Sequence, residues 1–268
     1  MQRRLAANRA NWEGRTPIHL RSAFYDVDGW LADRRGPRPE EVAMLGDVRG
    51  LRLAHPQCHI GLDTLGWARA GAIVTGLDFS PAAIAAARGI AERAGLEDQA
   101  RFVVADVHDA VRRLGGGAFD IVYVSTGALC WLPSVERWAA QMAGLLAAGG
   151  RLYLHDGHPV PNALAEEEAT FAASYFEEST PMAGDSDATY TDGERMVASR
   201  RTYQWNHGIG EVVTAVLAQG LRLERLVEYD WTDWRRFPWL VRGEDGRWAA
   251  PPGRPRLPLS FTLLARRA

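Results

Sequence analysis

The sequence of 268 residues contains no lysine, so that all 31 of its basic residues are arginine. Without lysine the chain cannot form a Schiff base with a carbonyl substrate or hold a nucleotide phosphate as a P-loop does. It also cannot use the Tyr-x-x-x-Lys pair on which one class of dehydrogenases depends. A GC-rich genome is enough to explain the bias toward arginine, and these three exclusions hold whatever its origin.

Cysteine, net charge and long apolar runs are scarce as well. Cys58 and Cys130 are too few for a disulfide framework or a cysteine metal site, and we expect two buried thiols and no bound metal. No apolar run approaches the roughly 20 residues of a membrane span, and the N-terminus MQRRLAANRANWEGR lacks the apolar core of a signal peptide. A net charge of −2 gives no general affinity for nucleic acid or for anionic membranes. These features predict a cytoplasmic protein.

From residue 51 onward, short apolar strands alternate with helices. The run FDIVYVS at 119–125 is typical of a parallel strand that is buried on both faces. Such alternation predicts an α/β fold with a doubly wound, Rossmann-like sheet. The strands expected in this half are 51–56, 72–78, 101–105, 119–125 and 151–155, and the helices are 63–71, 81–94 and 133–147.

The segments on either side of this half complete the expected architecture. Residues 1–48, with helices near 3–13 and 38–47, form an N-terminal helical arm, and residues 49–268 form the main domain. Two further strands bring the sheet to seven, mostly parallel, with the last strand antiparallel. Insertions at about 160–205 and 229–257 are expected on the substrate side. The other elements expected after residue 159 are helix 161–175, strand 196–204, helix 208–219, strand 221–228 and strand 258–267.

Acidic residues follow the strands at the edge of the sheet where ligands bind. Asp78 comes 17 residues after Gly61, close to the spacing of about 20 expected for an acid that accepts hydrogen bonds from ribose hydroxyls. Ser80 is placed to cap the next helix, so Asp78 is not needed there. Asp106 follows the third strand, where it would accept from an adenine amino group between the apolar walls Phe79 and Val107.

The loop between the first strand and its helix distinguishes between two cofactors. A dinucleotide requires G-x-G-x-x-G, because its pyrophosphate lies against bare backbone at a helix N-terminus. Here the loop reads Gln57-Cys58-His59-Ile60-Gly61, and the side chains of Gln57 and His59 would crowd a pyrophosphate. S-adenosylmethionine carries no phosphate, so a less open loop can hold it. The loop therefore favours S-adenosylmethionine over NAD.

Several motifs carry a resemblance to a known family. VTGLDFSPAAIAAAR, FVVADV, FDIVYV and LAAGGRLYLHD, together with the Gly61 loop, resemble class I S-adenosylmethionine-dependent methyltransferases over about residues 50–268. QCHIGLDTLGWARAGA, GALCWLPSVERWA and LYLHDGHPV are similar to a bacterial small-molecule subgroup whose loop reads Q-C-H-x-G-x-D-T-L. The chain departs from the wider class at His55, where the class has an acid, and at Gln57 and His59, where it has glycines.

The resemblance implies methyl transfer to an oxygen or nitrogen of a small metabolite, with S-adenosylhomocysteine as the second product. A monomer and a homodimer both remain open. Two alternatives also remain: a protein of this fold that binds the cofactor but catalyses another reaction or none, and an NAD-dependent oxidoreductase. No N/D-P-P-Y/F motif follows the fourth strand, which argues against methylation of DNA. The residues expected at the cofactor are Gln57, His59, Gly61, Asp78, Phe79, Ser80, Asp106, Val107, Ser125 and Tyr25.

The residues expected around the acceptor are less sharply defined. His155 and His158 follow the fifth strand, and an imidazole with a pKa of about 6.5 can take a proton from a hydroxyl or amine. Either histidine can instead brace the loop. The aromatic residues of the arm form a lid or pack it on the core, and His207 contacts substrate or caps a helix. The residues expected at the substrate are Trp12, Trp30, Asp156, His207 and Trp231.

Overall fold

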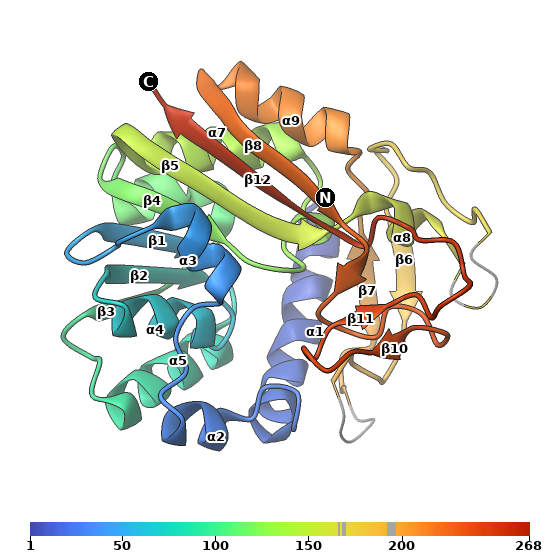
Figure 1. Cartoon of the computed structure of the whole chain (residues 1–268), viewed down its shortest axis with the longest axis horizontal. Coiled ribbons are helices and arrows are strands. Elements are labelled where there is room, and N and C mark those ends of the chain that lie inside the picture. Colours follow the sequence, from blue (N-terminus) through green and yellow to red (C-terminus); the bar gives the residue numbers. More distant parts are fainter. Residues whose placement is uncertain (166, 168–169, 192–196) are drawn as a thin grey trace.

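The computed structural model describes residues 1–165, 167, 170–191 and 197–268 (Figure 1). Its centre is a seven-stranded sheet in the order β3-β2-β1-β4-β5-β12-β8. All neighbours pair in parallel except β12, which runs antiparallel to β5 and β8. This confirms the predicted fold class. The strands are β1 (Arg52–Pro56), β2 (Ile73–Asp78), β3 (Ala100–Val104), β4 (Phe119–Val124), β5 (Leu146–Gly157), β8 (Leu221–Tyr229) and β12 (Ser260–Arg267).

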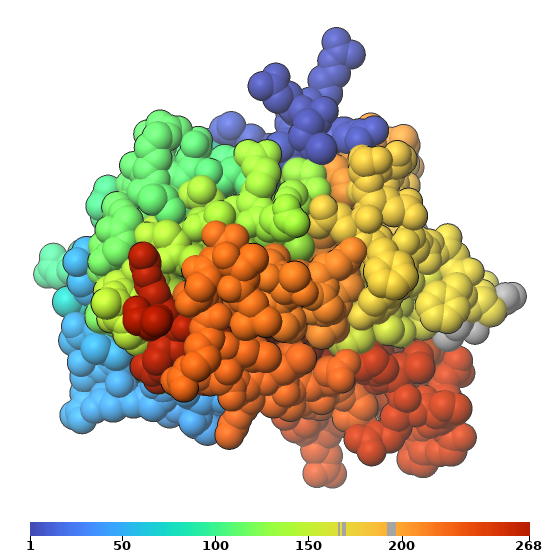
Figure 2. All heavy atoms as spheres, turned by 90° about the horizontal axis from the view of Figure 1, so that it is seen from above, coloured from blue at the N-terminus to red at the C-terminus, as the bar shows by residue number. Residues whose placement is uncertain are grey.

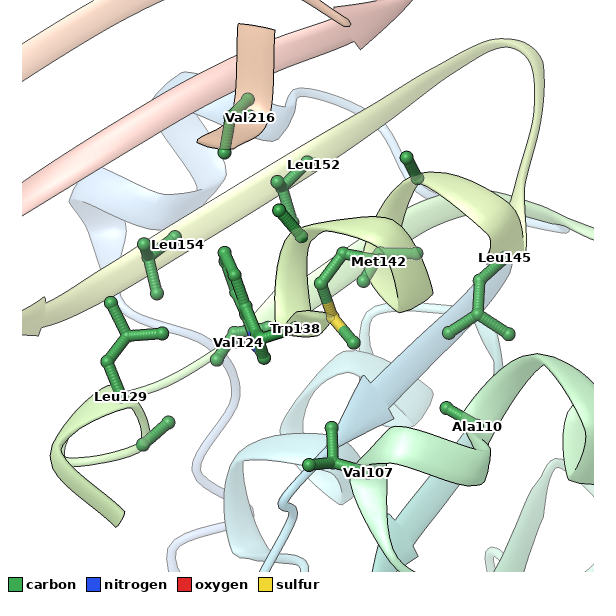
Figure 3. Close-up of a cluster of buried hydrophobic side chains, with 14 of the residues drawn as sticks. Val107, Ala110, Val124, Leu129, Trp138, Met142, Leu145, Leu152, Leu154 and Val216 are labelled. Carbon is green, nitrogen blue, oxygen red and sulfur yellow. The ribbon is translucent and has the colours of Figure 1, made fainter. Parts of the chain in front are cut away.

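Helices cover both faces of the sheet because its strands are apolar on both sides. On one face, Trp138 and Met142 of α7 pack against Leu152 and Leu154 of β5 (Figure 3). Since side chains alternate along a strand, Tyr153 points to the other face and stacks on Tyr123 of β4. Helix α3 (Pro39–Leu45) ends the arm, and the helices of the main domain are α4 (Leu62–Arg69), α5 (Pro81–Ala94), α6 (Ala110–Leu114), α7 (Val135–Leu145) and α9 (Ile209–Ala218), with 3-10 turns η1 (Val107–Asp109) and η2 (Leu129–Trp131).

The N-terminal arm is longer than its sequence indicates. Helix α1 spans Gln2–Arg21 and α2 spans Val27–Ala32, which was not predicted. Asn8 forms a pair of hydrogen bonds with the backbone of Tyr203, each 2.7 Å long, and Asn11 donates to the carbonyl of Ser199. These contacts fix the first half of α1, and beyond residue 13 the helix buries Thr16, Ile18 and His19, of which His19 contacts His59 and Thr189. None of the helices in the described ranges is long and apolar enough to cross a bilayer.

The two insertions lie at one end of the molecule (Figures 1 and 2). The first contains α8 (Pro159–Ala163) and the pair β6 (Met182–Asp185) and β7 (Arg201–Gln204). The predicted helix 161–175 is wrong beyond Ala163, because Leu164 is extended and packs with Phe237, Leu240 and Leu259, and residues 166, 168 and 169 of that prediction lie outside the described residues. The start of the predicted strand 196–204 lies outside the described residues. The second insertion contains the unpredicted strands β9 (Trp231–Thr232), β10 (Val241–Arg242) and β11 (Trp248–Ala249).

Candidate functional site

The sheet order reverses between β1 and β4, so a crevice is expected at the carboxyl ends of these strands. The β1–α4 loop borders it in a sharply turned conformation. Gln57 and His59 have φ of 62° and 50°, a left-handed conformation that is strained for residues with a side chain and is often found at functional sites. Gly61 has φ of 78°, and a Cβ there would lie 2.8 Å from the ring of Phe102. Gly61 therefore lets α4 begin close to β3.

Asp78 lies at the carboxyl end of β2, directly beside this loop. One carboxylate oxygen accepts the backbone N–H of His59 and the other accepts that of Ser80, both at 2.9 Å. The side chain of Ser80 caps α5 by accepting the N–H of Ala83. Burial raises the pKa of Asp78 to about 6. Strand β2 thus holds the buried carboxylate of Asp78 against the β1–α4 loop.

The end of β1 carries a neutral imidazole instead of an acid. His55 Nδ1 lies 2.8 Å from Thr64 Oγ1 and Nε2 lies 3.1 Å from Ser125 Oγ. Burial lowers the pKa of His55 to about 4. Gln57 donates to the carbonyl of Ala128, while its buried Oε1 has no hydrogen-bond partner among the described residues. Strand β1 therefore contributes polar groups but no charge.

Asp106 stands at the end of β3, as expected, and its carboxylate has local partners. It accepts the backbone N–H of His108 at 2.9 Å, which caps η1, and lies 2.8 Å from His108 Nδ1. The hydrogen bond with His108 lowers the pKa of Asp106. Val107 is buried and packs in the core, whereas Phe79 is half-buried. Asp106 thus remains partly exposed as an ionised acceptor.

Aromatic side chains from three parts of the chain meet over the β1–α4 loop. His19 of α1 lies 2.8 Å from His59 through one ring nitrogen and 2.7 Å from Thr189 Oγ1 through the other. The ring of Trp12 is edge-on to His59, with 5.2 Å between centroids, and Tyr25 bonds the hydroxyl of Tyr190. No spacing signal in the chain marks His19, Thr189 or Tyr190 in advance. The arm and the first insertion together cover this loop.

Of the two predicted catalytic residues, His155 and His158, His155 has fewer hydrogen bonds to its ring nitrogens. Its Nδ1 lies 2.9 Å from Thr262 Oγ1, while Nε2 has no hydrogen-bond partner in the described part of the chain and lies 3.7 Å from Asp233. Trp231 stacks on the ring, with 5.5 Å between centroids. In His158, by contrast, Nε2 lies 2.8 Å from Glu228 and Nδ1 accepts the N–H of Val160.

Three of the residues expected at the substrate are occupied by structural contacts. Asp156 accepts four backbone N–H groups and so fixes the loop after β4; the donors are Gly127, Ala128, Leu129 and Gly157. His207 lies between Glu177 and the carbonyl of Leu132 through its two ring nitrogens. Trp30 is buried in the core beneath the guanidinium of Arg69. These contacts account for all three without a substrate.

An ion pair beside His155 was not expected from the sequence. Arg38 donates to both carboxylate oxygens of Asp233 at 2.9 Å, and Thr126 lies 3.3 Å from Asp233. Burial alone would raise the pKa of Asp233, but His155 and Arg38 hold it well below its usual range. The pair joins the arm to the second insertion, so residues 195 apart meet. Such contacts leave no periodic signal in a sequence.

Asp63 is a second acid that was not predicted at the site. It lies in the first turn of α4 and is exposed, and its carboxylate forms no hydrogen bond or ion pair with the described residues. Burial raises the pKa of Glu41 and Tyr123, and the charge of Asp63 adds to both shifts. The carboxylate is therefore close enough to act on groups of both α3 and β4. The motif Gly61-Leu62-Asp63, which places an acid two residues after the glycine of the turn, was the sequence signal that could have indicated Asp63.

No three His, Cys, Asp or Glu side chains in the described ranges are arranged to hold a metal ion.

Comparisons with known proteins find methyltransferases. Residues 55–154 match the family model described as a methyltransferase domain. A search of curated proteins gives no match. An S-adenosylmethionine-dependent methyltransferase from Mesorhizobium loti is similar in structure, with a TM-score of 0.58, 22% identity, and coverage of 90% of this chain and 100% of that one.

Two further similar structures contain S-adenosylhomocysteine. Magnesium protoporphyrin IX methyltransferase from Synechocystis has a TM-score of 0.51 and 16% identity, covering 91% of this chain and 83% of that one. Geranyl diphosphate C-methyltransferase from Streptomyces coelicolor has a TM-score of 0.53 and 14% identity, covering 85% and 76%. At these identities the likeness establishes the Rossmann-like methyltransferase fold.

Proposed function

We propose that this chain is an S-adenosylmethionine-dependent methyltransferase that methylates an oxygen or nitrogen of a small metabolite. The observation that carries the proposal is the buried Asp78 carboxylate, held against the β1–α4 loop in the segment that matches a methyltransferase domain. The cofactor supplies a methyl group whose carbon–sulfur bond breaks as the bond to the acceptor forms, with the electron pair left on sulfur and a proton lost from the acceptor.

The residues present fit this cofactor at both of its ends. Asp78 is placed to accept hydrogen bonds from the ribose hydroxyls, and Asp106 and Phe79 border the expected adenine position. The unpartnered Oε1 of Gln57 offers a further buried acceptor. Asp63 supplies the charge that His55 lacks, and we assign it to the ammonium group of the methionine moiety. The chain's own part in the reaction is then to align the methyl group with the acceptor.

Calorimetric titration with S-adenosylmethionine, S-adenosylhomocysteine and NAD tests the proposal directly. We expect micromolar binding of the two sulfur compounds and no heat from NAD. Binding of NAD alone would contradict the proposal and support the dinucleotide alternative. The accepting atom is a separate question, since one protein of the same fold is a C-methyltransferase. Product analysis by mass spectrometry would identify that atom.

The role of Asp63 gives a sharper prediction. Asp63→Asn should weaken binding of S-adenosylhomocysteine about tenfold, because the variant loses a charged partner for the ammonium group. Methylthioadenosine has the same nucleoside but no amino-acid group, so its affinity should not change. Calorimetry on both ligands separates the two effects. An equal loss for both would mean that Asp63 acts through the fold of the loop.

The raised pKa of Asp78 predicts that cofactor binding depends on pH. The pKa is about 6 in the folded chain, above the ordinary 3.8, so the carboxyl is protonated below pH 6 and ionised above it. Ribose hydroxyls are better donors to the ionised form. Binding of S-adenosylhomocysteine should therefore tighten between pH 5 and pH 7, and Asp78→Asn should remove that dependence. A flat pH profile for the unaltered protein would contradict this assignment.

His155 is our candidate for the group that takes the acceptor's proton. Its Nε2 makes no hydrogen bond with the described residues but lies 3.7 Å from Asp233 in a buried position, so the acceptor must reach Nε2 beside that carboxylate. His155→Gln should leave the affinity for S-adenosylhomocysteine unchanged and lower turnover at least tenfold. The same turnover in both proteins would mean that His155 takes no proton, and that the alignment of the methyl group with the acceptor alone accelerates the reaction.

A further inference from the structure

A pocket opens beside the loop that Asp156 holds in place. It has a volume of about 380 Å³, part of it open to solvent. Gly127 and Leu129 border it from the end of β4, Asp156 from the end of β5, and Trp205 and Trp234 from the two insertions. The pocket therefore lies at the edge of the sheet where the cofactor loop ends, and on the side from which an acceptor would approach.

The charged groups that line this pocket are already compensated. The two oxygens of Asp156 accept four backbone N–H groups, and both ring nitrogens of His207 face protein oxygens. Burial raises the pKa of the Cys130 thiol, which keeps it neutral. Among the described side chains of the lining, none offers a free charge to a ligand. A carboxylate or an ammonium group would lose its hydration here without gaining a counter-ion.

Trp205 lines the pocket and has a buried indole N–H without a partner among the described residues. The side chain is only 2% exposed, and its backbone N–H is fixed by the carbonyl of Cys130 at 2.8 Å. Its indole Nε1 has no acceptor within the part of the chain that the structure describes. Buried indole N–H groups usually find a partner, so an oxygen on a ligand would satisfy this one.

The remaining walls are mostly apolar, and the two polar side chains among them, Asn162 and Asn206, bond each other. Rings of Trp234 and Phe261 line the pocket together with Trp205. Gly157 permits the close approach of Trp234, since a Cβ at that position would lie 3.0 Å from the indole ring. Trp205 and Asn206 also line a second pocket, where the carboxylate of Glu178 adds a charge that repels anions. Shape and charge thus favour a planar, neutral ligand.

On the basis of the function proposed above, we infer that this pocket holds the methyl acceptor, and that the acceptor is an uncharged aromatic molecule with an oxygen that accepts a hydrogen bond from Trp205. Pairs of probes that differ by one carboxylate test the inference on the protein saturated with S-adenosylhomocysteine. The pairs are 2-naphthol and 6-hydroxy-2-naphthoate, catechol and 3,4-dihydroxybenzoate, and 4-hydroxyacetophenone and 4-hydroxybenzoate.

We expect at least one neutral probe to bind, and to bind at least tenfold more tightly than its carboxylate partner, in calorimetry or saturation-transfer NMR. Trp205→Phe keeps an aromatic ring and removes the N–H, so it should lower the affinity for that probe several-fold. The matched control is Trp239→Phe, which removes another buried and unpartnered indole N–H that does not line the pocket. That control should bind the probe as the unaltered protein does.

The comparison of neutral and charged probes needs no variant, so a failure of Trp205→Phe to fold leaves the test intact. Carboxylates that bind as tightly as their neutral partners, or the absence of binding by all three neutral probes, would overturn the inference. Either result leaves the proposed function standing as long as S-adenosylhomocysteine binds. Absence of S-adenosylhomocysteine binding would instead overturn the proposed function and, with it, this inference.

Discussion

Asp78→Asn should weaken the binding of S-adenosylhomocysteine at least a hundredfold, a loss of about 2.7 kcal/mol. The buried carboxylate is placed to accept two ribose hydroxyls, and each charge-assisted hydrogen bond contributes roughly 1.5–3 kcal/mol. The amide keeps the shape of the side chain but gives up one acceptor and the charge. Calorimetric titration at pH 7.5 gives the affinity directly.

Two controls make this result specific. Asp106→Asn changes an acid at the end of the neighbouring strand. Its carboxylate is partly exposed and paired with His108, so the substitution should lower the affinity for S-adenosylhomocysteine less than tenfold. Asp78→Asn should lower the thermal unfolding temperature only moderately, because the raised pKa of Asp78 means that its charge destabilises the fold, while the amide still offers one oxygen to one of the two backbone N–H groups that Asp78 accepts. Normal binding by Asp78→Asn would show that the ribose lies elsewhere.

The second large effect is expected on stability. Asp156→Ala should lower the free energy of unfolding by about 3–5 kcal/mol, because it leaves several backbone N–H groups without an acceptor and each buried one costs roughly 1–3 kcal/mol. Ala128 and Leu129 are among the donors, and both are buried. Urea denaturation followed by tryptophan fluorescence would measure the change.

Asp156→Asn is the matched variant for this measurement. It keeps one carbonyl oxygen that can still accept two of the four N–H groups, so its loss of stability should be about half that of Asp156→Ala. Equal stability in all three proteins would mean that water replaces the carboxylate without cost. The loop at residues 127–129 would then be held by contacts other than those with Asp156.

The sheet could be predicted because its information is local. Each strand between residues 51 and 155 is a short apolar run that ends in a polar or glycine-rich loop. Asp78 follows Gly61 by 17 residues, close to the spacing expected of a ribose-binding acid. Helix α5 was predicted with its observed bounds, since Ser80 caps it and Pro81 begins it. For the same reason the sequence alone is enough to place the loop 57–61 and Asp78 together.

The parts that could not be predicted depend on contacts between distant segments. The last turns of α1 contact distant segments through His19, which lies against His59 and Thr189, and the extended Leu164 packs with Phe237 and Leu259. Arg38 and Asp233 each look like an ordinary surface charge until the second insertion folds against the arm. The spacing of residues carries no record of such pairs, so the ion pair was missed, although the arm had been expected either as a lid or as packing on the core.

The attachment of α1 has a consequence for the order of events during synthesis. The helix leaves the ribosome before the backbone that holds Asn8 and Asn11, which belongs to Tyr203 and Ser199. The partners are 195 and 188 residues apart, and the whole of that stretch must be translated before this helix finds them. Until then the half of the nascent chain that carries Gln57, Asp63 and Asp78 remains uncovered.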